Sequence, residues 1–88
     1  MSGTLHSEAN SELRKILVEA RNERGLSQAA LAKMIGRPPS FVGKYELAER
    51  RLDFVELLVV LRALNLELTS VVEQMQHVLP SKLGQDKS

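Results

Sequence analysis

The sequence predicts an all-α fold of five helices in a single domain. Apolar residues recur at three- and four-residue steps along most of the chain, and no segment shows the period of two that is typical of a strand. With 88 residues, the chain is near the small end of what can bury an adequate core. Its only aromatic residues are Phe41, Tyr45 and Phe54, so we expect an aliphatic core.

The N-terminal part predicts an arm followed by an amphipathic helix. Residues 1–10 are polar and contain a glycine, which favours a flexible arm. From about Ser11 to Arg24, leucine, isoleucine and alanine recur with helical spacing. Gly25 follows, and glycine commonly ends a helix because it adopts the left-handed conformation without steric cost. We therefore expect the first helix over residues 11–24.

Two short helices joined by a tight turn are predicted next. Ser27 is a suitable N-cap for a helix over residues 28–35, and Gly36 can supply the positive φ of the turn. Pro39 suits the first position of a third helix, which runs to about residue 47. This arrangement is a helix-turn-helix in the centre of the chain.

The fourth helix has a clear start signal and a clear stop signal. Asp53 and Glu56 have the spacing of a capping box, in which each side chain bonds to the backbone of the other residue. The apolar periodicity then continues to Leu64, and Asn65 can adopt the left-handed conformation that ends a helix.

The fifth helix is predicted over residues 68–79. Pro80 ends it because proline cannot continue a helix. Residues 80–88 form a polar C-terminal tail. The helix-turn-helix domain therefore spans residues 11–79.

Two stretches of the sequence carry a specific pattern: Arg21-x-x-x-Gly25-Leu26-Ser27-Gln28-x-x-Leu31-Ala32-x-x-x-Gly36 and Ser40-x-Val42-x-Lys44-Tyr45-Glu46. They resemble the phage repressor/Cro-type (XRE-like) helix-turn-helix family, and the similarity covers about residues 11–75. The resemblance implies a five-helix repressor-like DNA-binding domain whose third helix enters the DNA major groove, in a protein that is usually a dimer and controls transcription in bacteria or phages.

The resemblance assigns DNA contacts to eight residues. Lys44 is the main candidate for reading a base, since lysine can donate to O6 and N7 of guanine. Pro39 and Gly43 have no hydrogen-bonding side-chain group. The protein either reads thymine methyls and brings its backbone close to DNA there, or discriminates less between sequences. The others contact phosphates or support the base contact. The full set is Gln28, Arg37, Pro39, Ser40, Gly43, Lys44, Arg50 and Arg51.

Two further features concern how the third helix is attached to the rest of the domain. Arg21 and Glu46 match residues that the family joins as a structural ion pair between the first and third helices. The family normally has glycine after the third helix, whereas this chain has Leu47 and Ala48. A residue other than glycine in the left-handed conformation costs on the order of 1 kcal/mol.

The fourth and fifth helices carry more apolar residues than one small core needs. On the fourth helix, Phe54, Leu57, Leu58, Leu61 and Leu64 are sufficient for the core. A helix that is apolar nearly all round is expected to be buried on more than one side. We therefore predict a homodimer, with simple core packing as the alternative. A two-fold dimer would favour a palindromic DNA site. The predicted interface residues are Val55, Val59, Val72, Met75 and Leu79.

The sequence favours a sequence-specific regulator of transcription, most simply a dimeric repressor that acts by occupying its operator on double-stranded DNA. The alternative is an antitoxin-like or co-regulator module, whose main partner is another protein and whose DNA binding is secondary. Residues 1–52 carry nine Lys/Arg against six Asp/Glu, and residues 53–88 carry three against five. This asymmetry is weak support for a polyanion facing the N-terminal part.

Other classes of function find no support in the sequence. The two histidines, His6 and His77, are isolated, so neither an enzyme nor a metal site is expected, and no cofactor is predicted. The absence of cysteine excludes disulfides and is consistent with a cytoplasmic protein. Arg62 interrupts the longest apolar run, so no membrane span is expected.

Overall fold

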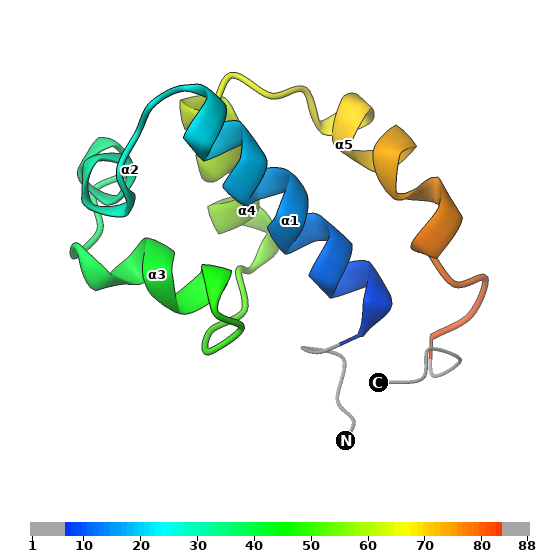
Figure 1. Cartoon of the computed structure of the whole chain (residues 1–88). Coiled ribbons are helices and arrows are strands. Elements are labelled where there is room, and N and C mark those ends of the chain that lie inside the picture. Colours follow the sequence, from blue (N-terminus) through cyan, green and yellow to red (C-terminus); the bar gives the residue numbers. More distant parts are fainter. Residues whose placement is uncertain (1–6, 84–88) are drawn as a thin grey trace.

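The computed structural model describes residues 7–83, and every regular element in this range is a helix (Figure 1). The predicted all-α fold with five α-helices is confirmed. The elements are α1 (Glu8–Glu23), α2 (Gln28–Met34), α3 (Ser40–Glu46), α4 (Phe54–Ala63) and α5 (Leu68–Met75), followed by one turn of 3-10 helix, η2 (Gln76–Val78).

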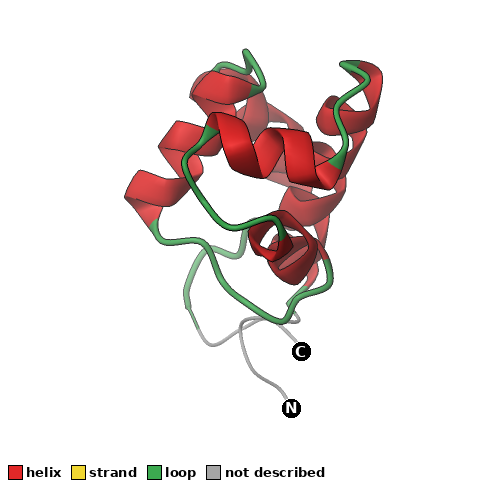
Figure 2. Cartoon of the chain, turned by 90° about the vertical axis from the view of Figure 1, so that its left-hand side faces the viewer, coloured by secondary structure: helices red, strands yellow, loops and turns green. Residues whose placement is uncertain are grey.

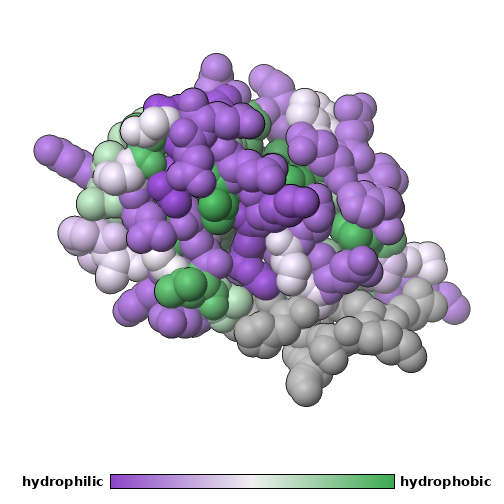
Figure 3. Space-filling view, viewed as in Figure 1, coloured by the Kyte–Doolittle hydropathy of each residue, from purple (hydrophilic) through white to green (hydrophobic). Residues whose placement is uncertain are grey.

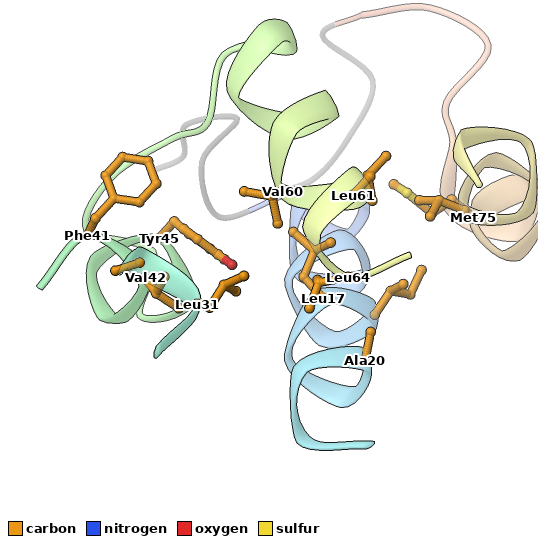
Figure 4. Close-up of a cluster of buried hydrophobic side chains, with 13 residues drawn as sticks. Leu17, Ala20, Leu31, Phe41, Val42, Tyr45, Val60, Leu61, Leu64 and Met75 are labelled. Atoms are coloured by element: carbon orange, nitrogen blue, oxygen red, sulfur yellow. The ribbon is translucent and has the colours of Figure 1, made fainter. Parts of the chain in front are cut away.

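Helix α1 lies in the middle of the molecule, with α2 and α3 on one side and α5 on the other (Figure 1). It packs against both α3 and α5, and α2 packs against α3. Figure 2 looks onto the side that carries α2 and α3. The side chains between the helices form one buried cluster, drawn in Figure 4: Ile16, Leu17, Ala20, Leu31, Ala32, Phe41, Val42, Tyr45, Val60, Leu61, Leu64, Val71 and Met75.

Helix α1 begins at Glu8 and not near Ser11, because the chain has a capping residue that the prediction missed. Ser7 is buried, and its hydroxyl oxygen accepts hydrogen bonds from the backbone nitrogen of Asn10 at 3.2 Å and from its side-chain nitrogen at 3.0 Å. Serine is a preferred N-cap because its oxygen satisfies one of the free N–H groups of the first turn. The predicted arm is therefore wrong for residues 7–10, and its residues 1–6 lie outside the described range.

Helices α1 to α4 all end with one residue in the left-handed conformation. These residues are Gly25 (φ 68°), Gly36 (φ 73°), Ala48 (φ 64°) and Asn65 (φ 57°). In each case the next backbone N–H bonds to a carbonyl in the last turn of the helix. This is the Schellman motif, which satisfies carbonyls that have no partner within the helix. The departure from glycine after the third helix therefore leaves the backbone unchanged and places an alanine in a strained conformation.

Replacing Ala48 with glycine is expected to stabilise the domain by about 1 kcal/mol, because only glycine adopts positive φ without a Cβ clash. For a domain of this size, we expect thermal unfolding to show a rise in Tm of roughly 4–8 °C. Ala29→Gly is the control, since Ala29 is exposed within helical α2; that change should lower stability by about 1 kcal/mol. A fall in Tm for Ala48→Gly would contradict strain at this turn.

The fifth helix is shorter than predicted. It ends at Met75, continues as the 3-10 turn and gives way at Leu79 to extended backbone, with φ −78° and ψ 123°. Leu79 precedes Pro80, and the proline ring disfavours helical conformation in the residue before it. Of the predicted tail, residues 84–88 lie outside the described range.

The division between core and surface differs from the prediction at three residues. Phe54 and Leu58, expected in the core, are 63% and 38% exposed. Met75, expected at a dimer interface, is buried in the core, where Figure 4 shows it beside Leu61. The periodicity alone did not settle these positions, because α4 is apolar on most of its circumference and has no polar face that would fix its rotation.

Tyr45 is buried without a hydrogen-bond partner for its hydroxyl group. Figure 4 shows its oxygen pointing into the middle of the apolar cluster. Burial raises the pKa of the Tyr45 phenol above its ordinary range, so the group stays neutral. A buried hydroxyl that makes no hydrogen bond costs roughly 1–3 kcal/mol of desolvation.

Tyr45→Phe is therefore expected to raise the free energy of unfolding by about 1 kcal/mol, since it removes the unsatisfied hydroxyl and keeps the ring. Urea denaturation of both proteins measures the difference. Phe41, which is also in the core, contacts Tyr45 edge to face with ring centroids 5.9 Å apart, so the aromatic contact is retained in the variant. A loss of stability would mean that the hydroxyl is hydrogen-bonded in solution.

Candidate nucleic-acid interface

Helix α3 presents a short outward face between buried residues. Val42 and Tyr45 are buried on its inner side, and Ser40 and Lys44, one turn apart, are exposed on its outer side. Pro39 precedes the helix and is exposed as well. Lys44 can donate hydrogen bonds, and Ser40 can donate or accept them. This face can therefore bond to both acceptors and donors on a partner.

Leu47 is exposed at the end of α3 and was not among the predicted DNA-contacting residues. It is the C-cap residue, three positions after Lys44, and 70% of its surface is accessible. Helical spacing puts it on the same side as Lys44. The face of the molecule in Figure 3 is mostly hydrophilic, with small, separate hydrophobic spots.

Gly43 leaves room for a neighbouring side chain. A Cβ atom at this position would lie only 3.2 Å from Oε1 of Gln28. The Gln28 amide therefore lies over α3 at Gly43, and its Nε2 donates to Oε1 of Glu46 at 2.8 Å. This contact gives Gly43 a role inside the protein, which the sequence analysis did not foresee. Gln28, the predicted phosphate contact at the start of α2, is held against α3 by the same contact.

Arg21 and Glu46 form a two-pronged ion pair between α1 and α3. Nε of Arg21 donates to Oε2 of Glu46 at 2.7 Å, and Nη2 donates to Oε1 at 3.1 Å. Nη1 also donates to the backbone oxygen of Leu26 at 2.8 Å. The side chains are only 12% and 6% exposed, and the hydrogen bond to Glu46 raises the pKa of Arg21. The pair fastens the C-terminal end of α3 to the rest of the domain.

Arg50 lies in a second ion pair, near the N-terminal end of α3. Its Nη1 and Nη2 donate to the two carboxylate oxygens of Glu56 at 2.8 and 2.7 Å, and Nη1 also donates to the backbone oxygen of Arg51 at 2.9 Å. The hydrogen bond from Arg50, and then that from the Asp53 backbone, lower the pKa of Glu56 to about 2.

Phe41 lies within cation–π distance of two guanidinium groups. The guanidinium carbon of Arg50 is 4.7 Å from the ring centroid, and that of Arg37 is 5.6 Å from it. Nη2 of Arg37 is also 3.6 Å from Oε2 of Glu56. Cation–π attraction and charge pairing therefore join the turn before α3, α3 itself and the start of α4. We call Arg37, Phe41, Arg50 and Glu56 the arginine–glutamate cluster.

Comparison with known proteins identifies the family to which this arrangement of helices belongs. A family model described as helix-turn-helix matches residues 17–71, well over half of the chain. A solved XRE-family like protein from Pseudomonas syringae pv. tomato is 36% identical, with a TM-score of 0.74, over 82% of this chain and 88% of that one. The chain belongs to the XRE-like helix-turn-helix family. It is thus a DNA-binding protein of the transcription-regulator class.

Other solved members of the XRE-like fold are similar. The restriction-modification controller protein C.AhdI from Aeromonas hydrophila is 32% identical, with a TM-score of 0.64, over 70% of this chain and 94% of that one. The controller protein C.Esp1396I has a TM-score of 0.73 over 82% of this chain and 94% of that one; at 19% identity this likeness concerns the fold. No curated protein matches the sequence.

Within the XRE-like fold, the structure divides the eight predicted DNA-contacting residues into two groups. Pro39, Ser40, Lys44 and Arg51 are exposed around α3. The others make contacts within the protein, although Gln28 and Arg37 are exposed as well: Gln28 with Glu46, Gly43 beneath Gln28, and Arg37 and Arg50 in the arginine–glutamate cluster. Glu56 was predicted only as part of a capping box, which is present, and its pairing with the arginines was not predicted.

The predicted interface residues of the XRE-like domain are exposed, apart from Met75. Val55 and Val59 are 66% and 43% exposed, and Val72 and Leu79 are 39% and 45% exposed. Four exposed apolar residues lie along one side of α4, and we call them the α4 apolar stripe: Phe54, Val55, Leu58 and Val59. Monomeric proteins seldom leave contiguous apolar residues of this kind uncovered.

Across residues 7–83, no group of three or more His, Cys, Asp or Glu side chains could hold a metal ion. In the same range, no helix has the length and apolar character needed to cross a membrane.

Proposed function

We propose that this XRE-like protein is a sequence-specific regulator of transcription that binds double-stranded DNA as a homodimer and represses by occupying its operator. The observation that carries the proposal is the exposed pair Ser40 and Lys44 on α3, which the rest of the domain holds on a short, outward-facing helix. A recognition helix of this kind enters the major groove and reads base edges. Reading bases requires no catalytic group, so the proposal includes no enzymatic activity.

The proposed DNA contacts fall into two classes. Lys44 and Ser40 contact base edges in the groove, with Pro39 beside them. Gln28 and Arg51 contact the phosphates on either side, where they fix the register of the helix on the DNA. Backbone N–H groups at the start of a helix also favour phosphate, and Gln28 begins α2.

The α4 apolar stripe supports the proposed homodimer. Two copies of the stripe, brought together about a two-fold axis, would cover Val55 and Val59, with Val72 and Leu79 as further candidates. A two-fold dimer of this type sets its recognition helices about 34 Å apart, one turn of DNA. The operator is then a palindrome, read in the cytoplasm where bacterial DNA lies.

The names of similar solved proteins are consistent with gene regulation. C.AhdI and C.Esp1396I are named as restriction-modification controller proteins, and another structural neighbour is named as the clp gene regulator ClgR from C. glutamicum. Those names describe those proteins. They favour a role in the control of transcription for this chain but do not indicate which genes it regulates.

Selection from random duplex DNA at about 150 mM salt tests the proposal, since phosphate contacts alone give weak, salt-sensitive binding without sequence preference. We expect enrichment of a palindrome whose half-sites lie about 10 base pairs apart. Sedimentation of the free protein at micromolar concentration measures the dimer. No enrichment, with only weak salt-sensitive binding, would reject the operator, and a monomer would reject the stripe as a dimer interface.

The second candidate is an antitoxin-like or co-regulator module whose main partner is another protein. The exposure of the α4 apolar stripe favours it, since a different protein could cover the same residues. A monomer that selects no DNA sequence but is captured by the product of a neighbouring gene would support this alternative.

A further inference from the structure

Helix α3 is too short to hold its own position. It has only seven residues, whereas isolated helices shorter than about 12–15 residues are marginal in water. Its orientation therefore depends on contacts with the rest of the domain. Val42 and Tyr45 anchor its inner side, and the Arg21–Glu46 ion pair anchors its C-terminal end.

The arginine–glutamate cluster anchors the other end. Phe41, in the first turn of α3, lies under the guanidinium group of Arg50. Arg50 is held in turn by both oxygens of Glu56. Glu56 belongs to the first turn of α4, where its Oε1 also accepts from the backbone nitrogen of Asp53 at 2.9 Å. A continuous chain of contacts thus links Phe41 to the start of α4.

We propose that Arg50 is a positioning residue that fixes the orientation of α3 through Phe41 and Glu56, and that it is not a phosphate ligand. The inference rests on the proposed function, because it concerns how the orientation of α3 gives the protein its preference for one DNA sequence. It replaces the expectation from the sequence, which placed Arg50 among the phosphate contacts.

The hydrogen bonds of Arg50 support this role. Its two terminal nitrogens donate to Glu56 and to the backbone oxygen of Arg51, and one flat side covers Phe41. A phosphate bound by the same two terminal nitrogens would have to displace a two-pronged carboxylate that is only 13% exposed. Charge-assisted pairs with this geometry are the strongest class of protein hydrogen bonds.

Arg50→Lys and Glu56→Gln test the inference together. Lysine keeps the charge but cannot make the two-pronged bond or stack on the ring. Glutamine keeps an oxygen for the capping box. The measured quantity is discrimination, the ratio of affinities for the selected DNA site and for random duplex. We expect each variant to lose about tenfold in discrimination, comparable to one base contact. The double variant should lose no more discrimination than either single variant, because both changes break the same contact between Arg50 and Glu56.

Matched controls separate this effect from a simple change of charge. Arg62→Lys makes the same exchange at an exposed residue of α4 that has no part in the proposed DNA contacts, and Glu49→Gln removes an exposed carboxylate in the same loop as Arg50. Both should leave discrimination unchanged. If Arg50 instead contacts phosphate, Glu56→Gln would release it, tighten binding to all DNA and preserve discrimination. Arg50→Lys would then keep discrimination as well. Either result would overturn the inference.

Hydrogen exchange of the free variants provides a reading that does not depend on DNA. Arg50→Lys and Glu56→Gln should lower the protection of the Lys44 and Tyr45 amides, while α1 amides such as Leu17 keep theirs. Unchanged protection in α3 would overturn the inference. If the wild-type protein selected no DNA sequence, the proposed function would fail, and this measurement would still decide whether Arg50 holds α3.

Discussion

Replacing Glu46 with alanine is expected to lower the free energy of unfolding by about 3–5 kcal/mol, the usual effect of removing one partner from a buried ion pair. The Glu46 side chain is 6% exposed and accepts from both Arg21 and Gln28. Without it, the Arg21 side chain, which is only 12% exposed in the wild-type domain, keeps only the Leu26 carbonyl as a partner among these contacts. Small domains have only about 5–15 kcal/mol of stability in total, so much of this would be lost.

Thermal unfolding followed by circular dichroism measures the effect, and the expected fall in Tm is on the order of 20 °C. Glu49→Ala is the control, because Glu49 is an exposed carboxylate only three residues away; we expect a change within about 0.5 kcal/mol. The paired variant Arg21→Met with Glu46→Leu should recover much of the loss, since it leaves no uncompensated charge. A loss below about 1 kcal/mol for Glu46→Ala would mean that the pair behaves like an exposed salt bridge.

Much of the fold could be predicted because its signals are local. Gly25 and Gly36 mark helix ends, and Asp53 with Glu56 forms the predicted capping box. Such features depend on residues within one turn of each other. The missed start of α1 was also local: Ser7 and Asn10 have capping spacing, but the polar composition of the first ten residues favoured an arm.

The candidate site could be predicted only in part, because its contacts join distant parts of the chain. The resemblance drew attention to Arg21 and Glu46, which the structure brings together. Nothing in the sequence indicated that Glu56 would pair with Arg50 across the loop before α4. The same holds for the Gln28 side chain above Gly43. These arrangements depend on side-chain geometry after the helices have packed, which periodicity does not specify.

The surface of α4 illustrates the same limit. Hydrophobic pattern identified the helix but could not fix its rotation, so Phe54 and Leu58 were assigned to the core. Their exposure widens the apolar surface beyond Val55 and Val59. The structure thus strengthens the physical case for a covering partner, while Met75 has no part in it.

Lys44→Ala is expected to lower affinity for the selected DNA site by about 10- to 100-fold, the loss of one base contact of about 1–3 kcal/mol. Lys44 is exposed on the outward face of α3, four residues after Ser40, and among the proposed base-contacting residues it is the only cation. Affinity for random duplex should fall much less, because a base contact contributes little there. Titrations against both DNAs measure the two losses, and Lys15→Ala, which removes an exposed charge from α1, is the control.

The same variant can identify the DNA atom that Lys44 contacts. If the ammonium group donates to N7 of a guanine, replacing that guanine with 7-deazaguanine should weaken wild-type binding, because the acceptor is gone. Lys44→Ala should bind both DNAs equally, since its contact has already been lost, and the two effects should not add. An equal loss of affinity for selected and random DNA, with a fall of about one in the salt slope, would instead make Lys44 a phosphate contact. Sequence preference would then have to come from Ser40, Pro39 and the shape of the DNA.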